Sequence, residues 1–279
     1  MEPTVASRTA LGAAGHRAAH QTLEGGRVFN DPLAVAILGA DAEDAIAFSS
    51  AKPERRGLRL FVAMRSRFAE DRAVRSIKNG VRQILILGAG LDTFAYRLEP
   101  AANVTVYELD HPATQREKRR RLAAAGVAEP PHVRYVSHDF ESEAMTGALA
   151  SAGFNPGERS FALWLGVTPY LTENAVLATL GELGRFPGGA EVVFDYVNPA
   201  HTIEDARLRA HRDGLAAHVA ASGEPFRCAL DTEALHARAR VVGFTEFEDL
   251  DIAALFARYL PAAPAPKPGP GGHVVRMGT

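Results

Sequence analysis

An apolar run that breaks into two closely spaced glycines is the feature that most constrains the fold of this chain. Residues 83–87 read Gln-Ile-Leu-Ile-Leu, and Gly88-Ala89-Gly90 follows directly. Such a run is typical of a buried parallel strand ending in a tight turn, where missing side chains let a ligand approach the backbone. A second apolar run, residues 104–107, ends in Glu108 and Asp110. Because an acid at the tip of a neighbouring strand can accept hydrogen bonds from ribose hydroxyls, the two runs together predict a site for an adenosine-containing cofactor.

The residues after the glycines favour one class of adenosine cofactor over another. A dinucleotide-binding loop needs a third glycine where Thr93 stands, so that a helix N-terminus can hold a pyrophosphate. Asp92 would repel phosphates but can face the positive charge of S-adenosylmethionine, which carries no phosphate. A plain strand-to-helix turn is the alternative for the glycines alone, and the acid after the second strand favours the cofactor site. We therefore expect a methyl donor rather than a nicotinamide.

Length, composition and charge exclude several other classes of protein. The chain has 279 residues, of which 47% are hydrophobic and 23% charged, enough to bury a large core in one or two domains. A net charge of -2 without a long basic run gives no electrostatic footprint for nucleic acid, so small molecules or protein termini are the expected partners. No apolar segment approaches the roughly twenty residues of a membrane span, and no membrane contact is expected.

Cysteine usage and the N-terminus indicate the compartment. Cys228 is the single cysteine, which excludes an internal disulfide and a cysteine-based zinc cage and fits an inert thiol in a reducing cytoplasm. Residues 1–4 lack the basic start of a secretory signal. We expect a cytoplasmic protein without a bound metal.

The order of apolar and helical segments predicts an α/β fold. From about residue 83 onward, strands alternate with helices, a pattern that produces a parallel sheet covered by helices on both faces. Helices are expected near 113–125, 173–186 and 232–241, the last with Asp231 or Thr232 as its N-cap. The expected strands lie near 83–87, 104–109, 133–137, 161–166, 190–196, 244–249 and 273–277.

The segments outside this alternation have their own signals. Residues 1–80 are predicted to be helical, with Phe61, Met64, Phe68 and Val74 on one apolar face and Asn79-Gly80 as the stop. Residues 261–272 are rich in proline and glycine, so a stiff surface loop is expected before the last strand.

Five ordered motifs resemble those of a known enzyme family. They are the segments 62–68 (Val-Ala-Met-Arg-Ser-Arg-Phe), 88–98, 107–112 (Tyr-Glu-Leu-Asp-His-Pro), 139–141 (Asp-Phe-Glu) and 164–171 (Trp-Leu-Gly-Val-Thr-Pro-Tyr-Leu). In this order and spacing, the stretch from about Ser7 to Tyr196 resembles the leucine carboxyl methyltransferase-like family of S-adenosylmethionine-dependent methyltransferases. The likeness is closer to the bacterial branch linked to O-methylation in secondary metabolism than to the enzymes that methylate a phosphatase C-terminus.

The resemblance implies a fold and a division of the chain. The expected fold is the Rossmann-like, seven-stranded class I methyltransferase sheet, with an antiparallel last strand and an N-terminal helical cap. Residues 1–279 would then form a single methyltransferase domain, with residues 1–80 as the cap and residues 81–279 as the core.

The resemblance also implies which residues bind the methyl donor. Arg65 would pair with the methionine carboxylate, a task that suits a guanidinium fork, with Arg67 as the fallback and Arg8 as a looser match. Solvated helix charges are the alternative for the two helix arginines. Gly88, Ala89 and Gly90 would pass under the methionine and ribose, and Asp110 or its neighbour Glu108 would hold the ribose hydroxyls.

Two further segments complete the implied donor site. Asp139 would accept from the adenine amine and Phe140 would cover the ring, although an aspartate here could instead cap the next helix. Leu165 stands where many relatives carry a glutamate that touches the cofactor, which puts any role of that position in doubt. Gly166 would lie near the transferred methyl.

The acceptor side is less determined by the sequence. Tyr170, Tyr196 and His201 are the predicted substrate-binding residues, because they follow the fourth and fifth strands at the lip of the sheet. A carboxylate acceptor needs no proton removed, whereas an alcohol or phenol would benefit from a base such as His111, His138, His201 or Tyr170. The acceptor and the oligomeric state stay open.

We therefore expect an S-adenosylmethionine-dependent methyltransferase that transfers a methyl group to a carboxyl or hydroxyl oxygen of a small molecule. A protein C-terminal carboxyl methyltransferase and a scaffold that binds the cofactor without methyl transfer are the alternatives.

Two other patterns in the sequence give only weak evidence of a binding site. His16 and His20 lie four residues apart, a spacing that metal ligands use, but without a third ligand in register we expect solvated side chains. The basic run from Arg116 to Arg121 is likewise expected to be a solvated helix face.

Overall fold

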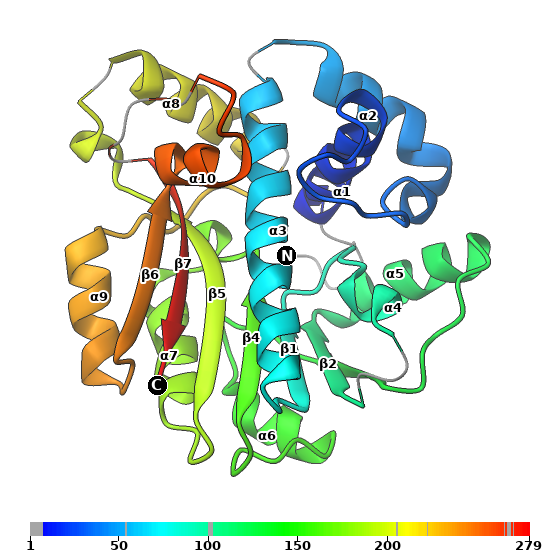
Figure 1. Cartoon of the computed structure of the whole chain (residues 1–279), viewed down its shortest axis with the longest axis vertical. Helices are drawn as coiled ribbons and strands as arrows, with labels where there is room; N and C mark the ends of the chain where they lie inside the picture. The colour runs from blue at the N-terminus through cyan, green and yellow to red at the C-terminus, as the bar shows by residue number, and fades with distance from the viewer. Residues whose placement is uncertain are drawn as a thin grey trace.

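A seven-stranded sheet with the order β3-β2-β1-β4-β5-β7-β6 runs through the centre of the protein (Figure 1). The computed structural model describes residues 8–53, 55–99, 103–204, 206–221, 223–264, 266, 269 and 271–279. Strands β1 to β5 pair in parallel, and β7 is antiparallel to both β5 and β6. The predicted sheet, including its antiparallel last strand, is confirmed. The strands are β1 (Gln83–Leu87), β2 (Thr105–Asp110), β3 (Val133–Ser137), β4 (Ser160–Trp164), β5 (Ala190–Val197), β6 (Glu246–Asp251) and β7 (Gly272–Gly278).

Helices precede the sheet and connect its strands. The first group comprises α1 (Arg8–Leu23), η1 (Ala36–Asp41), α2 (Ala42–Ser50) and α3 (Arg55–Lys78). The others are α4 (Phe94–Arg97), α5 (Pro112–Ala124), α6 (Met145–Ser151), η3 (Thr168–Tyr170), α7 (Glu173–Gly184), η4 (Ala200–Thr202), α8 (Ala206–Ala221), α9 (Thr232–Val241) and α10 (Ile252–Tyr259).

The starts of the predicted helices follow from their capping residues. Pro112 occupies the first turn of α5, where its missing N–H costs nothing. The Asp231 carboxylate accepts from the Ala234 N–H at 3.0 Å, which confirms it as the N-cap of α9. No helix in the described ranges is long and apolar enough to cross a membrane.

The two faces of the sheet carry separate hydrophobic cores. Leu85 and Leu87 of β1 pack into a core with α6, α7 and α9, whereas Ile84 and Ile86 face a core formed with α3 and α10. Because side chains alternate along a strand, burial of both faces requires every residue of β1 to be apolar or hydrogen-bonded. This requirement explains why Gln83–Leu87 was recognisable in the sequence, and helices on both faces are confirmed.

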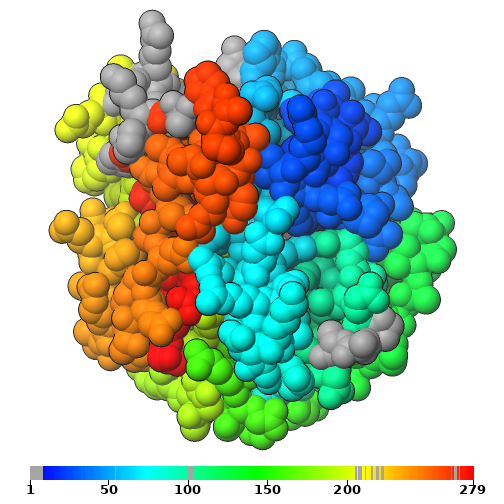
Figure 2. Space-filling model, viewed as in Figure 1, coloured from blue at the N-terminus to red at the C-terminus, as the bar shows by residue number. Residues whose placement is uncertain are grey.

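Helix α3 crosses the sheet and supports the N-terminal helices. In the space-filling view, the N-terminal helices (blue) abut α3 (cyan), and the α10 region (orange) lies on its other side (Figure 2). Met64 and Phe68 face the sheet as predicted, but the assignment of Val74 to this face was wrong, since its side chain is 39% exposed. Ala69 and Ala73 continue the buried stripe instead, and both side chains are fully buried.

The expectation of solvated histidines at positions 16 and 20 is wrong. His16 is buried and its Nδ1 shares a hydrogen bond of 2.9 Å with Ser49 Oγ, which ties α1 to α2. His20 is fully buried, with Nδ1 at 3.3 Å from Glu24 and Nε2 accepting from the Val28 N–H at 3.3 Å. Both imidazoles therefore have structural partners within the N-terminal helical region.

The basic run on α5 is also only partly solvated. Arg119 and Arg120 are exposed, as expected. Lys118 is buried and its Nζ lies 2.8 Å from Glu108 Oε2, while Arg121 donates to the Leu38 carbonyl at 2.7 Å. The buried side chains of Lys118 and Arg121 therefore link α5 to β2 and to η1.

His16 should make the protein sensitive to mild acid. Its burial, together with the nearby charges of Arg65, Arg59 and Arg55, lowers the pKa of His16 to about 4. An unfolded histidine titrates near 6.5, so the unfolded state binds more protons between these two values and stability falls as the pH drops through that window. Urea unfolding from pH 7 to 4 should show wild type losing roughly 3 kcal/mol more than His16→Gln. Glutamine can keep the hydrogen bond to Ser49, and parallel pH curves for the two proteins would contradict the prediction.

Candidate functional site

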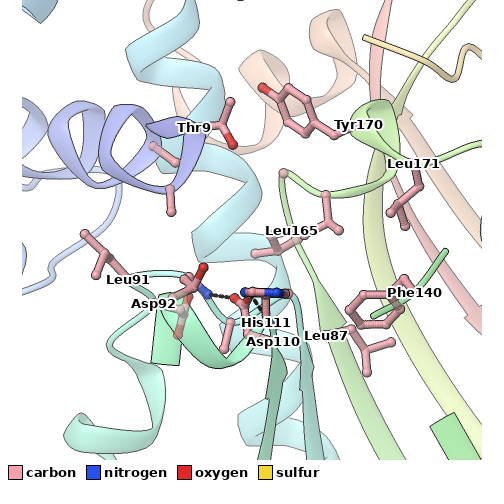
Figure 3. A pocket seen from close by; sticks show the side chains of 18 of the residues that line it. Thr9, Leu87, Leu91, Asp92, Asp110, His111, Phe140, Leu165, Tyr170 and Leu171 are labelled. Carbon is pink, nitrogen blue, oxygen red and sulfur yellow. Dashed lines mark hydrogen bonds between the residues drawn. The ribbon is translucent and has the colours of Figure 1, made fainter. Parts of the chain in front are cut away.

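A cavity of about 540 Å³ opens at the carboxyl ends of β1, β2 and β4, beneath the first turns of α1. This volume falls within the roughly 300–1,000 Å³ that is typical of small-ligand sites. In Figure 3, Asp110 and His111 form the floor, with Leu91 and Asp92 on one side, Phe140 and Leu87 on the other, and Thr9 and Tyr170 above. The predicted residues that line the cavity are Arg65, Gly88, Ala89, Gly90, Asp110, Asp139, Phe140, Gly166 and Tyr170.

The glycine loop after β1 is constrained both by its backbone angles and by the side chains that pack closely against it. Gly88 and Gly90 have φ values of 66° and 46°, in the left-handed region that favours glycine. A Cβ on Gly88 would lie 2.4 Å from Val167 Cγ2, and one on Gly90 would lie 3.1 Å from Ala10 Cβ. The loop backbone therefore runs between the segment after β4 and helix α1, and borders the cavity with main-chain atoms.

Asp110 at the end of β2 is held by the glycine loop. Its Oδ2 accepts from the Gly90 N–H and its Oδ1 from the His111 N–H, both at 2.6 Å (Figure 3). Burial raises the pKa of Asp110, and the two backbone donors partly oppose that shift. Since each carboxylate oxygen can accept a second hydrogen bond, the fixed side chain retains capacity for a ligand hydroxyl.

Glu108, the alternative ribose acid, does not line the cavity. It lies within β2, its side chain is fully buried, and it pairs with Lys118. Burial raises the pKa of Glu108 to about 7, and the Lys118 charge opposes the shift. The structure thus separates the two acids, leaving Asp110 at the cavity and Glu108 against α5.

The segment after β3 brings an aromatic ring to the cavity wall. Phe140 stacks on Trp164 with ring centroids 6.2 Å apart, and the His138 ring packs perpendicular to Phe140 with centroids 4.6 Å apart. Asp139 lines the cavity, but its Oδ1 also accepts from the Glu141 N–H at 3.0 Å and its Oδ2 from the Ser142 hydroxyl at 3.0 Å. The carboxylate therefore caps the turn that holds Phe140 in place, rather than the N-terminus of α6.

Arg65 reaches the cavity from α3 and is held by an acid that the sequence analysis did not select. Its Nη1 donates to Asp195 Oδ2 at 2.6 Å, and Asp195 Oδ1 accepts from the Gly166 N–H at 2.6 Å. A Cβ on Gly166 would lie 2.6 Å from Arg65 Nη2, so the guanidinium passes directly over this glycine. Nε of Arg65 is buried and makes no hydrogen bond to any described residue.

The fallback residue Arg67 and the looser match Arg8 differ from Arg65 in placement. Arg67 is about half exposed on α3 and pairs with Asp71 at 2.8 Å, outside the cavity. The side chain of Arg8 lies outside the described part of the chain. Arg65 is thus the helix arginine that the fold brings to the cavity.

The three predicted substrate residues lie in different places. Tyr170 lines the cavity, packs against Phe226 at 5.3 Å, and has its pKa raised to about 12 by burial, so its hydroxyl is protonated at neutral pH. Tyr196 is buried on the opposite side of β5, where its hydroxyl donates to Asp249 at 2.7 Å. His201 is an exposed residue of η4 and does not line the cavity.

A comparison with protein families identifies the group to which this architecture belongs. Residues 10–184, more than half of the chain, match the family model described as leucine carboxyl methyltransferase. The chain belongs to the leucine carboxyl methyltransferase family. The match spans most of α1, all of α2 and α3, the glycine loop, Asp110, Phe140 and the segment after β4.

Curated relatives carry names that agree with this assignment, and a solved structure shares the fold. A Bacillus subtilis protein named "Putative S-adenosyl-L-methionine-dependent methyltransferase YktD" is 36% identical over 151 residues, covering 53% of this chain and 49% of the relative. A Saccharopolyspora erythraea protein with the same class name is 34% identical over 182 residues, covering 63% of this chain and 62% of the relative. The chain thus spans about half to two thirds of these relatives. The crystal structure of a possible exported protein from Bordetella parapertussis is similar in fold, with a TM-score of 0.50, 13% identity, and coverage of 99% and 97% of the two chains.

Other residues line the cavity of this family member without having been expected there. Arg17 of α1 donates from Nη2 to the Leu91 carbonyl at 2.6 Å and contacts Asp31. Glu224 accepts from the Thr9 N–H at 2.9 Å, which joins the start of α1 to the segment after α8. These contacts link residues 74 and 215 positions apart, so no local pattern in the sequence could have indicated them.

The close approach at Gly88 gives a test of the loop in this methyltransferase-family protein. We predict that Gly88→Ala weakens binding of S-adenosylhomocysteine at least tenfold, because the new methyl meets Val167 at a positive φ that costs roughly 1–2 kcal/mol. Gly12→Ala is the matched control, because Gly12 lies in helix α1 and a Cβ added there would meet nothing within 4 Å. Titration calorimetry measures both, and equal affinities in the two variants would contradict the close approach.

Proposed function

We propose that the protein is an S-adenosylmethionine-dependent O-methyltransferase that acts on a carboxyl or hydroxyl group of a small molecule. The observation that carries the proposal is the pairing of two features in one cavity. Asp110, held by the glycine loop, is suited to a ribose, and the edge of Arg65 that has no hydrogen-bond partner among the described residues is suited to a carboxylate. A ligand that contains both groups, and no phosphate, is the methyl donor.

The residues around the cavity fit the remaining parts of that donor. Phe140 offers an aromatic face to a purine, and the main chain of Gly88 and Gly90 leaves room for the amino-acid arm. The Gly90 N–H, which a phosphate would need, is already bonded to the Asp110 carboxylate. A pyrophosphate would meet this negative charge, so the arrangement disfavours a dinucleotide.

Positioning and exclusion of water are the main tasks left to the protein. When bound, S-adenosylmethionine supplies a methyl group on a sulfonium, whose thioether is a good leaving group. The chain contributes by fixing the donor through Arg65 and Asp110 and by shielding the acceptor beneath α1. Burial lowers the pKa of His138, which lines the cavity, so its imidazole is neutral at pH 7 and able to accept a proton from a hydroxyl acceptor.

The cover over the cavity favours a small acceptor over a protein tail. Thr9 of α1 and Glu224 both line the cavity, and the Thr9 N–H donates to the Glu224 carboxylate at 2.9 Å. Arg227 lies nearby and pairs with Glu141 at 2.9 Å across the same wall. A peptide terminus would need an open groove here, whereas a metabolite needs a covered pocket.

The proposal extends to the whole chain. We propose a single methyltransferase domain in which residues 1–80 form a cap and residues 81–279 the core, supported by α3 packing on both the sheet and α1. A role in secondary metabolism in the cytoplasm fits the resemblance to the bacterial branch and the single Cys228, whose pKa is raised to about 11 by burial.

Two measurements in sequence test the proposed activity. Titration calorimetry should show binding of S-adenosylmethionine and no binding of NAD, because the loop lacks a pyrophosphate site. Incubation with radiolabelled donor and a panel of phenolic and carboxylic metabolites should then label at least one acceptor. Binding of NAD alone would refute the cofactor assignment, and binding without any labelled product would favour a non-methylating scaffold.

The two helix arginines provide a matched pair of variants. We predict that Arg65→Ala weakens binding of S-adenosylhomocysteine by about 1.5–3 kcal/mol, the range for a hydrogen bond to a charged group. Arg67→Ala removes the same charge from the same helix but outside the cavity, and should leave the dissociation constant unchanged. The reverse result, measured by calorimetry, would move the carboxylate contact to Arg67.

A further inference from the structure

Asp195 lies where three segments of the cavity wall meet. Its carboxylate accepts from Arg65 Nη1 of α3 and from the Gly166 N–H of the segment after β4, both at 2.6 Å. Its main-chain carbonyl accepts from Thr168 Oγ1 at 2.5 Å. A single residue of β5 thus fixes both the arginine and the loop that borders the glycine turn.

The contact to Asp195 determines which edge of the guanidinium is left for a ligand. An arginine can bind a carboxylate bidentately through Nε and Nη2, which point in the same direction. Here Nη1 is used by Asp195, whereas Nε and Nη2 make no hydrogen bond to the described residues. Nε is also buried, so water cannot accept a hydrogen bond from it. A ligand in the cavity would have to supply the acceptor.

The surroundings of Arg65 indicate that this orientation is imposed. The side chain is about nine-tenths buried and lies against Gly166, so it has little space for other rotamers while the ion pair is intact. The pleat of β5 sends Val193 and Asp195 toward the α3 face and Phe194 and Tyr196 toward the other. The sheet itself therefore points the Asp195 carboxylate at Arg65.

We propose that Asp195 is a positioning residue, which holds Arg65 so that its Nε–Nη2 edge faces the carboxylate of the bound methyl donor. This inference rests on the proposed function and adds a residue beyond the segment matched by the family model, which ends at residue 184. Loss of the Asp195 charge would free Nη1 and let the guanidinium turn, without altering the ribose or adenine contacts.

Two ligands separate this role from a general structural one. S-adenosylhomocysteine carries the amino-acid carboxylate, and 5′-methylthioadenosine has the same adenosine and thioether without it. Wild type should bind the first at least tenfold more tightly than the second. In Asp195→Asn the amide oxygen can still accept from the Gly166 N–H, which keeps the loop in place, but the amide nitrogen then faces Arg65 and cannot accept from it. The preference should therefore fall to within about twofold while 5′-methylthioadenosine binds as before. Arg65→Gln should show the same loss, and the double variant should lose no more.

Thr168→Val is the matched control, because it removes the hydrogen bond to the main-chain carbonyl of Asp195 and leaves the carboxylate in place. It should lower the melting temperature and keep the wild-type preference between the two ligands. If Asp195→Asn does not fold, Gly166→Ala displaces the same guanidinium from its other side, because the added Cβ would lie 2.6 Å from Nη2. That variant should show the same fall in preference.

The outcomes distinguish this inference from the function on which it rests. An equal loss of affinity for both ligands in Asp195→Asn, or an unchanged preference, would overturn the positioning role while leaving the proposed function intact. A wild-type protein that binds neither ligand would refute the proposed function, and the inference with it.

Discussion

The reversal of strand order between β1 and β4 is the constraint on which the site depends. The chain leaving β1 turns toward β2 and the chain leaving β4 turns toward β5, so the two connections diverge and a crevice opens between them. Every part of the candidate site borders this crevice. Gly88, after β1, and Val167, after β4, lie in close contact at the two edges of the crevice. Asp110 lies on its β2 side, and Asp195 lies on its β5 side.

Helix α3 forms part of the wall of this crevice. It lies across the sheet and carries Arg65 to the crevice, where the buried ion pair with Asp195 sets the direction of the guanidinium. Taking two charges out of water costs free energy, so such a pair is retained more readily for positioning than for stability. Helix α1 lies over the opening, and buried groups such as His16 join it to α2.

The fold was largely predictable because its signals are local. A strand buried on both faces must be apolar along its length, and residues such as Gln83–Leu87 show this directly. Asp231 marks the start of α9 in the same way. The sequence analysis named no helix at α8 or α10, where polar residues or the short length obscure the period. Val74 was misplaced because the buried side of α3 continues through Ala69 and Ala73, which leaves Val74 on the exposed side of the helix.

The site was predictable where a residue follows a strand end and unpredictable where contacts span the chain. Gly88, Asp110 and Phe140 lie at the cavity because the carboxyl ends of parallel strands meet there. Tyr196 faces away from the cavity because neighbouring residues of β5 point to opposite faces of the sheet, so that Asp195 points to Arg65 at the cavity instead.

A crystal structure with S-adenosylhomocysteine is the most direct test of the site. The ligand carboxylate should lie on the Nε–Nη2 edge of Arg65, and the ribose should lie on Asp110. A ligand lying outside the crevice, or with its carboxylate turned away from Arg65, would contradict it.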